Sequence, residues 1–367
     1  MYKILFISVS LAQDGTQMFM MNVLRHIDRS KFQIDFCIYS DEKTPNWKEA
    51  ESYGCKIYVL PSRRDNLIKS IIACFSFFKR HAHEYQAVHW NGGNLSSSIS
   101  LVFSWLFRVP IRIVHAHSSS ATGLHNRILH KINRLFIPLV CNRYFACSSE
   151  ASNFFFPHVH PVLINNGIDV KKFDYSPNIR IDVRKELNIN EEIRVIGHVG
   201  RFDENKNQTF ILDVFVEYHK KEPNSLLLLI GKGEMLETIK KKARKLGIDH
   251  SVKFLGVRTD VHRIMQALDC FIMPSKYEGL PFVLVEAQCS GLICVVSDTI
   301  NHDAKITNNI EFIPLSSGKQ EWCCAIEKLI LQHIRTSQLD VLTEKGYSIG
   351  ETVRFLEKVY EGDKCYK

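Results

Sequence analysis

Residues 270–287, with the sequence CFIMPSKYEGLPFVLVEA, contain one complete strand–turn–helix unit. Residues 270–273 are a short apolar run typical of a buried strand, and residues 282–289 have the length and composition of a helix. A glycine turn joins them, and Pro281 is expected in the first helical turn, where a missing N–H costs nothing. A strand that leads directly into a helix is the repeating unit of a parallel sheet.

The same alternation of short apolar runs and longer amphipathic segments extends along the whole chain. The first half contains seven candidate strands: Ile4–Val9, Phe32–Tyr39, Lys56–Leu60, Ala87–Trp90, Ile111–His115, Tyr144–Cys147 and Val162–Ile164. After a charged stretch, six more follow: Ile193–Val199, Leu226–Ile230, Val252–Leu255, Cys270–Met273, Ile293–Val296 and Phe312–Leu315. The helices expected in this half are Lys206–Lys220, Glu234–Leu246, Phe282–Cys289 and a tail from about Gln320.

A chain of 367 residues is long enough for two domains of roughly 150 residues each. The sequence therefore predicts an α/β protein with two doubly wound Rossmann-like domains that face a central cleft. We expect the first domain at residues 1–172 and the second at residues 173–349, with a final helix at about 350–367 that packs back on the first. Parallel sheets of this kind bind ligands beyond the carboxyl ends of their strands.

The composition is that of a folded protein, because 45% of the residues are hydrophobic and 23% are charged, which excludes disorder, collagen and coiled coil. The net charge of +8 lies entirely in the first 175 residues, where 20 Lys and Arg face 12 Asp and Glu. A one-sided basic field suits an anionic partner such as a phospholipid surface. Nucleic acid is not expected, since no recognition module is present.

The eleven cysteines include no C-x-x-C pair and are odd in number, which argues against a disulfide framework or a zinc site and fits a reducing cytoplasm. The first apolar run is too short for a signal peptide. The longest uncharged stretch, residues 88–107, contains Asn, Gly and Ser residues that do not suit a membrane span. We expect a cytoplasmic protein with peripheral contact at the inner face of the cell membrane.

Glu278 and Glu286 lie just before the helix at residue 282 and about one turn inside it, so both carboxylates can face one ligand. The start of that helix offers N–H groups and a positive dipole end to a phosphate. Arg201 and Lys206 follow the strand at 193–199 and would stabilise the charge of a diphosphate leaving group. In the alternative interpretation none of these residues binds a ligand. The two glutamates then cap the helix and face solvent. Arg201 forms a surface ion pair, and Lys206 is exposed to solvent.

Three further loops carry candidate residues. Gly231 and Gly233 would allow the backbone to approach a planar base, or form only a strand-to-helix turn. Gly15 lies between the first strand and a helix. His115 and His117 lie at the end of another strand. There they would contact a ligand, coordinate a metal or form hydrogen bonds with the backbone. No acidic or cysteine residue that could complete a metal site is near them in sequence.

Residues 63–83 combine apolar residues with basic residues at both ends. A helix with this pattern either lies on a membrane surface or covers the sheet as a core helix.

The spacing of Glu278 and Glu286 within EGLP and EAQCSG resembles the signature of the family 4 retaining glycosyltransferases, two-domain enzymes with the GT-B fold. Some of them act in bacterial capsular or exopolysaccharide synthesis. Other motifs similar to those of the family follow its order: NGID at 166–169, GHVGRF at 197–202, LIGKGE at 229–234 and VSD at 296–298. In the loop at 10–17 the chain departs from the family, with Asp14 in place of Gly and Gln17 in place of Glu.

The resemblance implies transfer of a sugar from a nucleoside diphosphate donor, a UDP-sugar, to a glycan or a polyprenyl-diphosphate-linked acceptor, without a metal or other cofactor. It implies catalytic roles for Glu278, His117, Arg201 and Lys206. The implied donor-binding residues are Gly15, Gly231, Gly233, Gly279, Leu280 and Glu286, together with Arg201 and Lys206; His115 and Asn166 are secondary candidates. The alternatives are a nucleotide-sugar 2-epimerase and a non-catalytic sugar-nucleotide-binding partner of another transferase.

Overall fold

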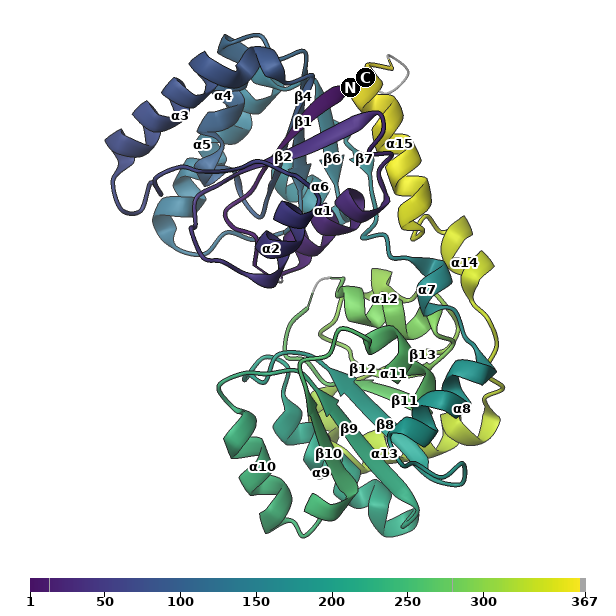
Figure 1. The fold of residues 1–367 in the computed structure, drawn as a ribbon. Helices are drawn as coiled ribbons and strands as arrows, with labels where there is room; N and C mark the ends of the chain where they lie inside the picture. The colour runs from purple at the N-terminus through teal and green to yellow at the C-terminus, as the bar shows by residue number, and fades with distance from the viewer. Residues whose placement is uncertain (13, 279, 364–367) are drawn as a thin grey trace. The chain divides into compact units, whose positions relative to one another are not determined.

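The computed structural model describes residues 1–12, 14–278 and 280–363 (Figure 1). The chain forms two compact units. Unit 1 consists of Met1–Gly167 and the segment that begins at Ser348, and unit 2 consists of Ile168–Tyr347. The boundary therefore lies between Gly167 and Ile168, earlier than the expected 172. The side chain of Asn22 in unit 1 donates to the Gly167 carbonyl, whereas the Ile168 N–H donates to Tyr347 of unit 2.

Unit 1 contains a seven-stranded parallel sheet in the order β3-β2-β1-β4-β5-β6-β7. Its strands are β1 Tyr2–Ile7, β2 Phe32–Ile38, β3 Ile57–Val59, β4 Ala87–Gly92, β5 Ile111–Ala116, β6 Arg143–Ala146 and β7 Val162–Leu163. Its helices are α1 Gly15–His26, α2 Pro45–Ser52, α3 Leu67–His81, α4 Ile99–Leu106, α5 Leu124–Val140, α6 Ser149–Phe155 and α15 Ile349–Glu361.

The two faces of this sheet are covered by different helices, as the doubly wound fold requires. Side chains of α3, α4, α5 and α6 pack with one face in a single hydrophobic cluster. Helix α15 packs against α1 and β1 and buries Val353, Leu356, Val359 and Tyr360 (Figure 1). The backbone N–H of Asp28 also donates to Glu357 of this helix. The C-terminal segment is therefore part of the unit in which the chain begins.

Unit 2 contains a six-stranded parallel sheet in the order β10-β9-β8-β11-β12-β13. Its strands are β8 Arg194–Val199, β9 Ser225–Ile230, β10 Val252–Gly256, β11 Cys270–Met273, β12 Ile293–Ser297 and β13 Ile310–Ile313. Its helices are α7 Val170–Phe173, α8 Pro177–Glu186, α9 Gln208–Lys221, α10 Leu236–Lys245, α11 Val261–Ala267, α12 Phe282–Cys289, α13 Gly318–Gln332 and α14 Leu339–Glu344. The predicted fold class, two doubly wound Rossmann-like parallel sheets, is confirmed.

Many predicted bounds differ from the structure by one or two residues, and two of the differences have a clear local cause. Strand β13 ends at Ile313 rather than Leu315, because Pro314 has no N–H for the ladder. Helix α9 begins at Gln208 rather than Lys206, because Asn207 before it adopts the left-handed conformation with φ of 56°. Lys206 therefore lies in a loop. Pro281 is the residue before α12 rather than a residue of its first turn.

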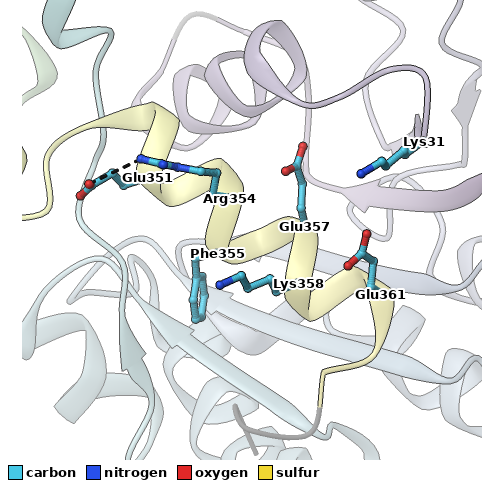
Figure 2. A pocket seen from close by; sticks show the side chains of 7 residues that line it. All are labelled: Lys31, Glu351, Arg354, Phe355, Glu357, Lys358 and Glu361. Atoms are coloured by element: carbon cyan, nitrogen blue, oxygen red, sulfur yellow. Dashed lines mark ion pairs between the residues drawn. The ribbon is translucent and has the colours of Figure 1, made fainter.

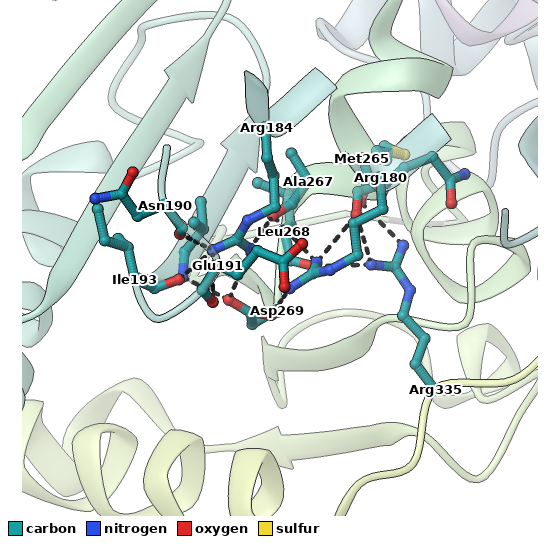
Figure 3. Close-up of polar contacts among 12 residues, drawn as sticks. Arg180, Arg184, Asn190, Glu191, Ile193, Met265, Ala267, Leu268, Asp269 and Arg335 are labelled. Atoms are coloured by element: carbon teal, nitrogen blue, oxygen red, sulfur yellow. Dashed lines mark hydrogen bonds and ion pairs between the residues drawn. The ribbon is translucent and has the colours of Figure 1, made fainter. Parts of the chain in front are cut away.

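Arg180, Arg184 and Arg335 form polar contacts at the edge of unit 2 where its strands begin (Figure 3). Asp269, which precedes β11, binds Arg180 at 2.6 Å and accepts the Val195 N–H at 2.7 Å. The guanidinium of Arg184 lies 3.5 Å from the other oxygen of the same carboxylate. Arg335 donates to the carbonyls of Met265, Gln266 and Leu268 near the end of α11. Burial and the nearby Arg180 lower the pKa of Arg335 to about 9.

Most cysteines of the described residues are buried and all ten are unpaired. No helix among these residues is long and apolar enough to cross a membrane.

Candidate functional site

The polar candidates of unit 2 gather where its sheet changes winding direction. Strands β8 and β11 are neighbours, but α9 after β8 packs on one face of the sheet and α12 after β11 on the other. The loops that follow these two strands therefore diverge, and ligands of such sheets bind at this point. Arg201 and Lys206 lie in the first loop, and Glu278 lies in the second.

Lys206 and Glu278 form an ion pair between the two loops, with Nζ and Oε1 2.6 Å apart and each side chain 17% exposed. Asn205 strengthens the junction. Its amide donates to Glu278 Oε1 at 3.1 Å and to the Tyr277 carbonyl at 2.9 Å, and its carbonyl oxygen accepts the Tyr277 N–H at 3.1 Å. The structure thus brings together two residues predicted separately. An ammonium has three donors, so Lys206 can bind a phosphate while it keeps Glu278.

Arg201 has a different partner. Its Nε donates to Asp203 Oδ2 at 2.7 Å, and its side chain is 76% exposed. The other oxygen of Asp203 accepts the backbone N–H of Lys206 at 2.9 Å, although Asp203 itself is nearly buried. Asp203 therefore orients both cations of the loop. Arg201 presents its guanidinium to solvent, where it can reach an anionic ligand.

His198, in the strand that precedes this loop, helps to hold the loop in place. It is fully buried in β8, and its Nδ1 lies 2.9 Å from the Ile272 carbonyl of β11. Gln208 lies 3.3 Å from the other ring nitrogen and donates to the Arg201 carbonyl at 2.7 Å. Burial lowers the pKa of His198 to about 4, so the ring is neutral at physiological pH. His198 has a structural role, and Gln208 transmits it to the loop.

Gly231 and Gly233 are required by packing between two loops. Gly231 has a φ of 138°, and a Cβ on it would collide with the Gly200 carbonyl oxygen. A Cβ on Gly233 would collide with the backbone of Phe202. The Phe202 N–H also donates to the Lys232 carbonyl at 3.0 Å. The turn after β9 therefore fixes the loop that carries Arg201 and Lys206, a role that the sequence analysis did not assign to these glycines.

Glu286 lies on α12 in surroundings that favour its neutral form. Burial raises the pKa of its carboxyl to about 7, against the opposing charge of Lys172 on α7. Leu280, between Glu278 and the helix, packs against the hydrophobic cluster on this face of the sheet. The predicted donor-binding residue Gly279 lies outside the described residues. No side-chain hydrogen bond from Pro281 caps helix α12, and the expected binding of a phosphate at its positive end stays a prediction.

The candidates of unit 1 lie at the carboxyl ends of three different strands, and only Gly15, after β1, follows a strand at the switch point between β1 and β4. Gly15 is the first residue of α1, and Asn166 is buried in the segment after β7. His117 follows β5, and its Nε2 lies 3.0 Å from Asn91 Oδ1. Since the amide of Asn91 donates to the His89 carbonyl, its oxygen faces His117 and accepts the Nε2 proton.

His115 and His117 lie on one side of the sheet, with ring centroids 4.0 Å apart, but only His117 is partly exposed. His115 is fully buried beside His89, which in turn contacts Tyr360 of α15 at 2.7 Å. Burial lowers the pKa of His117 to about 3 and that of His115 well below the usual range. His117 is therefore neutral at physiological pH and can accept a hydrogen bond at Nδ1.

Within the described ranges, no group of three or more His, Cys, Asp or Glu side chains is arranged to hold a metal ion. A surface pocket in unit 1 lies between the Lys31 side chain and α15 (Figure 2). It contains none of the predicted site residues, and its lining is mostly charged: Lys31, Glu351, Arg354, Phe355, Glu357, Lys358 and Glu361.

Three residues that hold these loops in place were not predicted from the sequence. Asn205, Asp203 and Asn91 are small polar residues within two positions of predicted site residues or near the end of a buried strand. That position is the signal that could have found them, because a polar residue at a carboxyl strand end is well placed to bond a neighbouring loop.

Comparison with known proteins gives evidence that is independent of this geometry. The family described as "Glycosyl transferases group 1" matches residues 179–332. The chain is 30% identical over 373 residues to the glycosyltransferase EpsF of Bacillus subtilis, covering 98% of this chain and 96% of the relative. It is 26% identical to the capsular polysaccharide biosynthesis glycosyltransferase CapH of Staphylococcus aureus, covering 98% and 99%.

A third relative is the UDP-Gal:alpha-D-GlcNAc-diphosphoundecaprenol alpha-1,3-galactosyltransferase of Escherichia coli. It is 24% identical over 255 residues, which cover 66% of this chain and 65% of the relative. Among solved structures, Anabaena HepE in complex with UDP superposes with a TM-score of 0.78 at 17% identity, covering 98% of this chain and 100% of that protein. At this identity the likeness concerns the fold.

Proposed function

The chain belongs to the group 1 glycosyltransferases, and we propose that it transfers a sugar from a UDP-sugar to a lipid-linked glycan acceptor, with retention of configuration, in cell-surface polysaccharide synthesis. The observation that carries the proposal is the Lys206–Glu278 ion pair at the switch point of unit 2. It places a fixed cation and a carboxylate where a sheet of this type binds its ligand.

In the proposed reaction, the bond between the anomeric carbon and the diphosphate oxygen breaks, and that oxygen takes the electron pair. Lys206 and Arg201 stabilise the charge that develops on the leaving diphosphate, aided by the positive end of α12. Because Asn205 and Asp203 already hold this loop, little reorganisation is needed as the charge forms. The acceptor hydroxyl attacks from the face that the diphosphate leaves, and its proton passes to a phosphate oxygen.

Glu278 would accept hydrogen bonds from hydroxyls of the transferred sugar, and Glu286 would accept them from the donor ribose. In unit 1, the role proposed for His117 is to accept a hydrogen bond from a sugar hydroxyl at Nδ1, as a neutral ring whose Nε2 is held by Asn91. A neutral histidine is not a proton donor at that nitrogen. The role of His117 is therefore positioning of the sugar rather than general acid catalysis.

The choice of donor and acceptor is supported by proteins similar to this chain. The Escherichia coli relative is named for UDP-Gal as donor and a diphosphoundecaprenol-linked sugar as acceptor. The Staphylococcus aureus relative is named for capsular polysaccharide biosynthesis, and the solved neighbour was crystallised with UDP. Family membership favours transfer over the 2-epimerase and over the non-catalytic partner.

The test is a panel of sugar nucleotides with the purified full chain. We expect UDP-sugars to raise the unfolding temperature more than GDP- or CMP-sugars, since a ligand at 100 times its Kd stabilises by about 2.7 kcal/mol. With a polyprenyl-diphosphate-linked acceptor, NMR of the product should show the anomeric configuration of the donor. A free epimer formed without acceptor would support the epimerase instead, and binding without turnover would support the non-catalytic partner.

A pH-dependent prediction concerns Glu286. Its folded-state pKa of about 7 lies above the ordinary value of 4.5, so the folded protein holds a proton that the unfolded chain has lost. The contribution to stability is therefore fully present below about pH 4.5 and falls as the pH rises toward 7. Glu286→Gln removes this loss. We expect the unfolding temperature of the variant, relative to wild type, to be higher at pH 8 than at pH 5.

The matched control is Glu344→Gln, an exposed glutamate of unit 2, whose unfolding temperature should follow wild type at both pH values. In the same samples, UDP-sugar affinity of wild type should rise with pH through 7, because an ionised Glu286 accepts ribose hydroxyls better. Donor affinity of Glu286→Gln should be weaker and independent of pH. A variant that keeps the wild-type pH profile in both measurements contradicts the assignment.

A further inference from the structure

Helices α3, α4 and α5 each have two apolar faces. The inner face packs on the sheet, as Cys74, Phe77 and Phe78 of α3 do. The outer face is exposed: Ile68 of α3 and Leu139 of α5 are 71% and 70% exposed. The described residues include 26 exposed large hydrophobic side chains, and 13 of them lie in these three helices. We call the exposed side chains of Leu67–His81, Ile99–Leu106 and Leu124–Val140 the α3–α5 face.

The three helices form one surface. The ring of Phe75 on α3 lies 5.6 Å from that of Phe103 on α4, and α4 packs against α5. Before α3, Arg63 hydrogen-bonds Asn126 of α5, which joins the two outer helices at one end. Figure 1 shows the helices beside one another on the same side of the unit 1 sheet. Exposed apolar surface that is continuous in this way marks an interaction site.

Charge distinguishes this face from the rest of the protein. The sequences of α3, α4 and α5 contain no Asp or Glu. They contain six Lys and Arg residues: Lys69, Lys79, Arg80, Arg127, Lys131 and Arg134. Their long stems can lie along apolar surface while the charged ends reach an aqueous, anionic layer. The excess of positive charge in the first half of the sequence is thus partly gathered around exposed Leu, Ile and Phe side chains.

We propose that the α3–α5 face docks on a membrane surface that contains anionic phospholipid. Lipid matches both properties of the face, because acyl chains receive the apolar side chains and phosphate headgroups neutralise the basic ones. A second copy of this chain does not match, since two such faces would bring like charges together. From the sequence, residues 63–83 were expected to form either a membrane-surface helix or a core helix. The structure shows that α3 has a core face and an outer face at once, and it adds α4 and α5 to the exposed surface.

The position of the face fits an acceptor carried by lipid. Helix α5 begins directly after the loop that follows β5 and contains His117. Docking would hold this loop at the headgroup layer, where the diphosphate of a lipid-linked glycan lies. The membrane proposal itself rests on the surface of unit 1 and not on the donor site.

The experiment is co-sedimentation of the full chain with phosphatidylcholine vesicles, with and without about one third phosphatidylglycerol. We expect strong binding to the anionic vesicles, weakened by salt, because screening shortens the range of surface charge to about 10 Å at 0.1 M. Leu135→Glu/Leu139→Glu should lower the partition coefficient by about tenfold or more for each side chain. The matched control is Leu331→Glu/Ile334→Glu, a similarly exposed pair in unit 2.

Charge is tested separately. Lys131→Gln/Arg134→Gln should weaken binding to anionic vesicles and leave binding to phosphatidylcholine unchanged. Lys241→Gln/Lys245→Gln, on the basic helix α10 that lacks an exposed apolar face, is the control and should bind as wild type. Donor binding, followed by the thermal shift with UDP-sugars, should be unchanged in all four variants, so that a failure of the donor proposal is distinguishable.

Three results would overturn the proposal. One is equal vesicle binding by wild type and by Leu135→Glu/Leu139→Glu. Another is loss of binding in the α10 control, which would move the contact to unit 2. The third is a stable dimer in sedimentation velocity that Leu135→Glu/Leu139→Glu converts to monomer, which would make the face an interface between two copies of this chain.

Discussion

Lys206→Ala is expected to lower the turnover of sugar transfer by about 10²–10³-fold, the usual effect of removing one preorganised group that stabilises developing charge. Glu278→Ala should cause a loss of similar size, because it removes the proposed sugar contact and leaves Lys206 without its partner at 2.6 Å. Some fall in the unfolding temperature is expected in each single variant, because each side chain is only 17% exposed and loses its partner, but Asn205 and Asp203 still hold the loop.

The double variant distinguishes a coupled pair from two independent groups. If Lys206 acts only while Glu278 orients it, the loss in Lys206→Ala/Glu278→Ala is smaller than the product of the two single losses. Lys245→Ala and Glu344→Ala, exposed residues of the same unit, serve as charge-matched controls and should keep wild-type turnover. Full activity in both single variants would contradict the proposed donor site.

Asp269→Ala is expected to give the largest loss of stability, about 3–5 kcal/mol in the free energy of unfolding of unit 2. The substitution removes the carboxylate shared by Arg180 and Arg184 and leaves the Val195 N–H without its acceptor. Arg184 is 3% exposed, so its charge has no access to water in compensation. Removing one partner of a buried ion pair destabilises a protein far more than the intact pair stabilises it.

Hydrogen exchange followed by mass spectrometry at increasing urea separates the two units. Protection of β8 and β11 should be lost at lower urea in Asp269→Ala, whereas protection of β1 and β4 should follow wild type. Asp182→Ala, on the exposed side of α8, is the control and should change the free energy of unfolding by about 0–1 kcal/mol. Asp269→Asn should fall between them, because an amide oxygen can still accept one hydrogen bond. If protection of β8 is unchanged in Asp269→Ala, the hydrogen bonds from the arginines to backbone carbonyls are sufficient to stabilise this edge of the sheet without the carboxylate.

Local pattern was enough to predict the two sheets. Alternating apolar runs report burial on their own element, and every predicted strand is present in the structure. The residues proposed for the donor site were also recognisable, because each follows a predicted strand and keeps the spacing of a known motif. Some of the bounds that differed depend on single residues, such as Pro314 after β13 and Asn207 before α9.

Pairing between distant loops was not predictable in the same way. Lys206 and Glu278 meet because β8 and β11 are neighbours in the sheet, and strand order is not written in the periodicity of either strand. For the same reason the packing of the glycines at 231 and 233 against the backbone of residues 200–202 was not predicted, and their contact with a donor stays a prediction. The tautomer of His117 depends on Asn91 of the adjacent strand.

The sequence alone established two parallel α/β domains, their strands and the residue types at the strand ends, since each of these follows from local hydrophobic pattern and motif spacing. The assembled structure established which of those residues touch, which histidine solvent can reach, and which apolar faces remain uncovered. Periodicity shows that α3 has an apolar face, but only the packing of α3, α4 and α5 on the sheet shows that a second apolar face is left exposed.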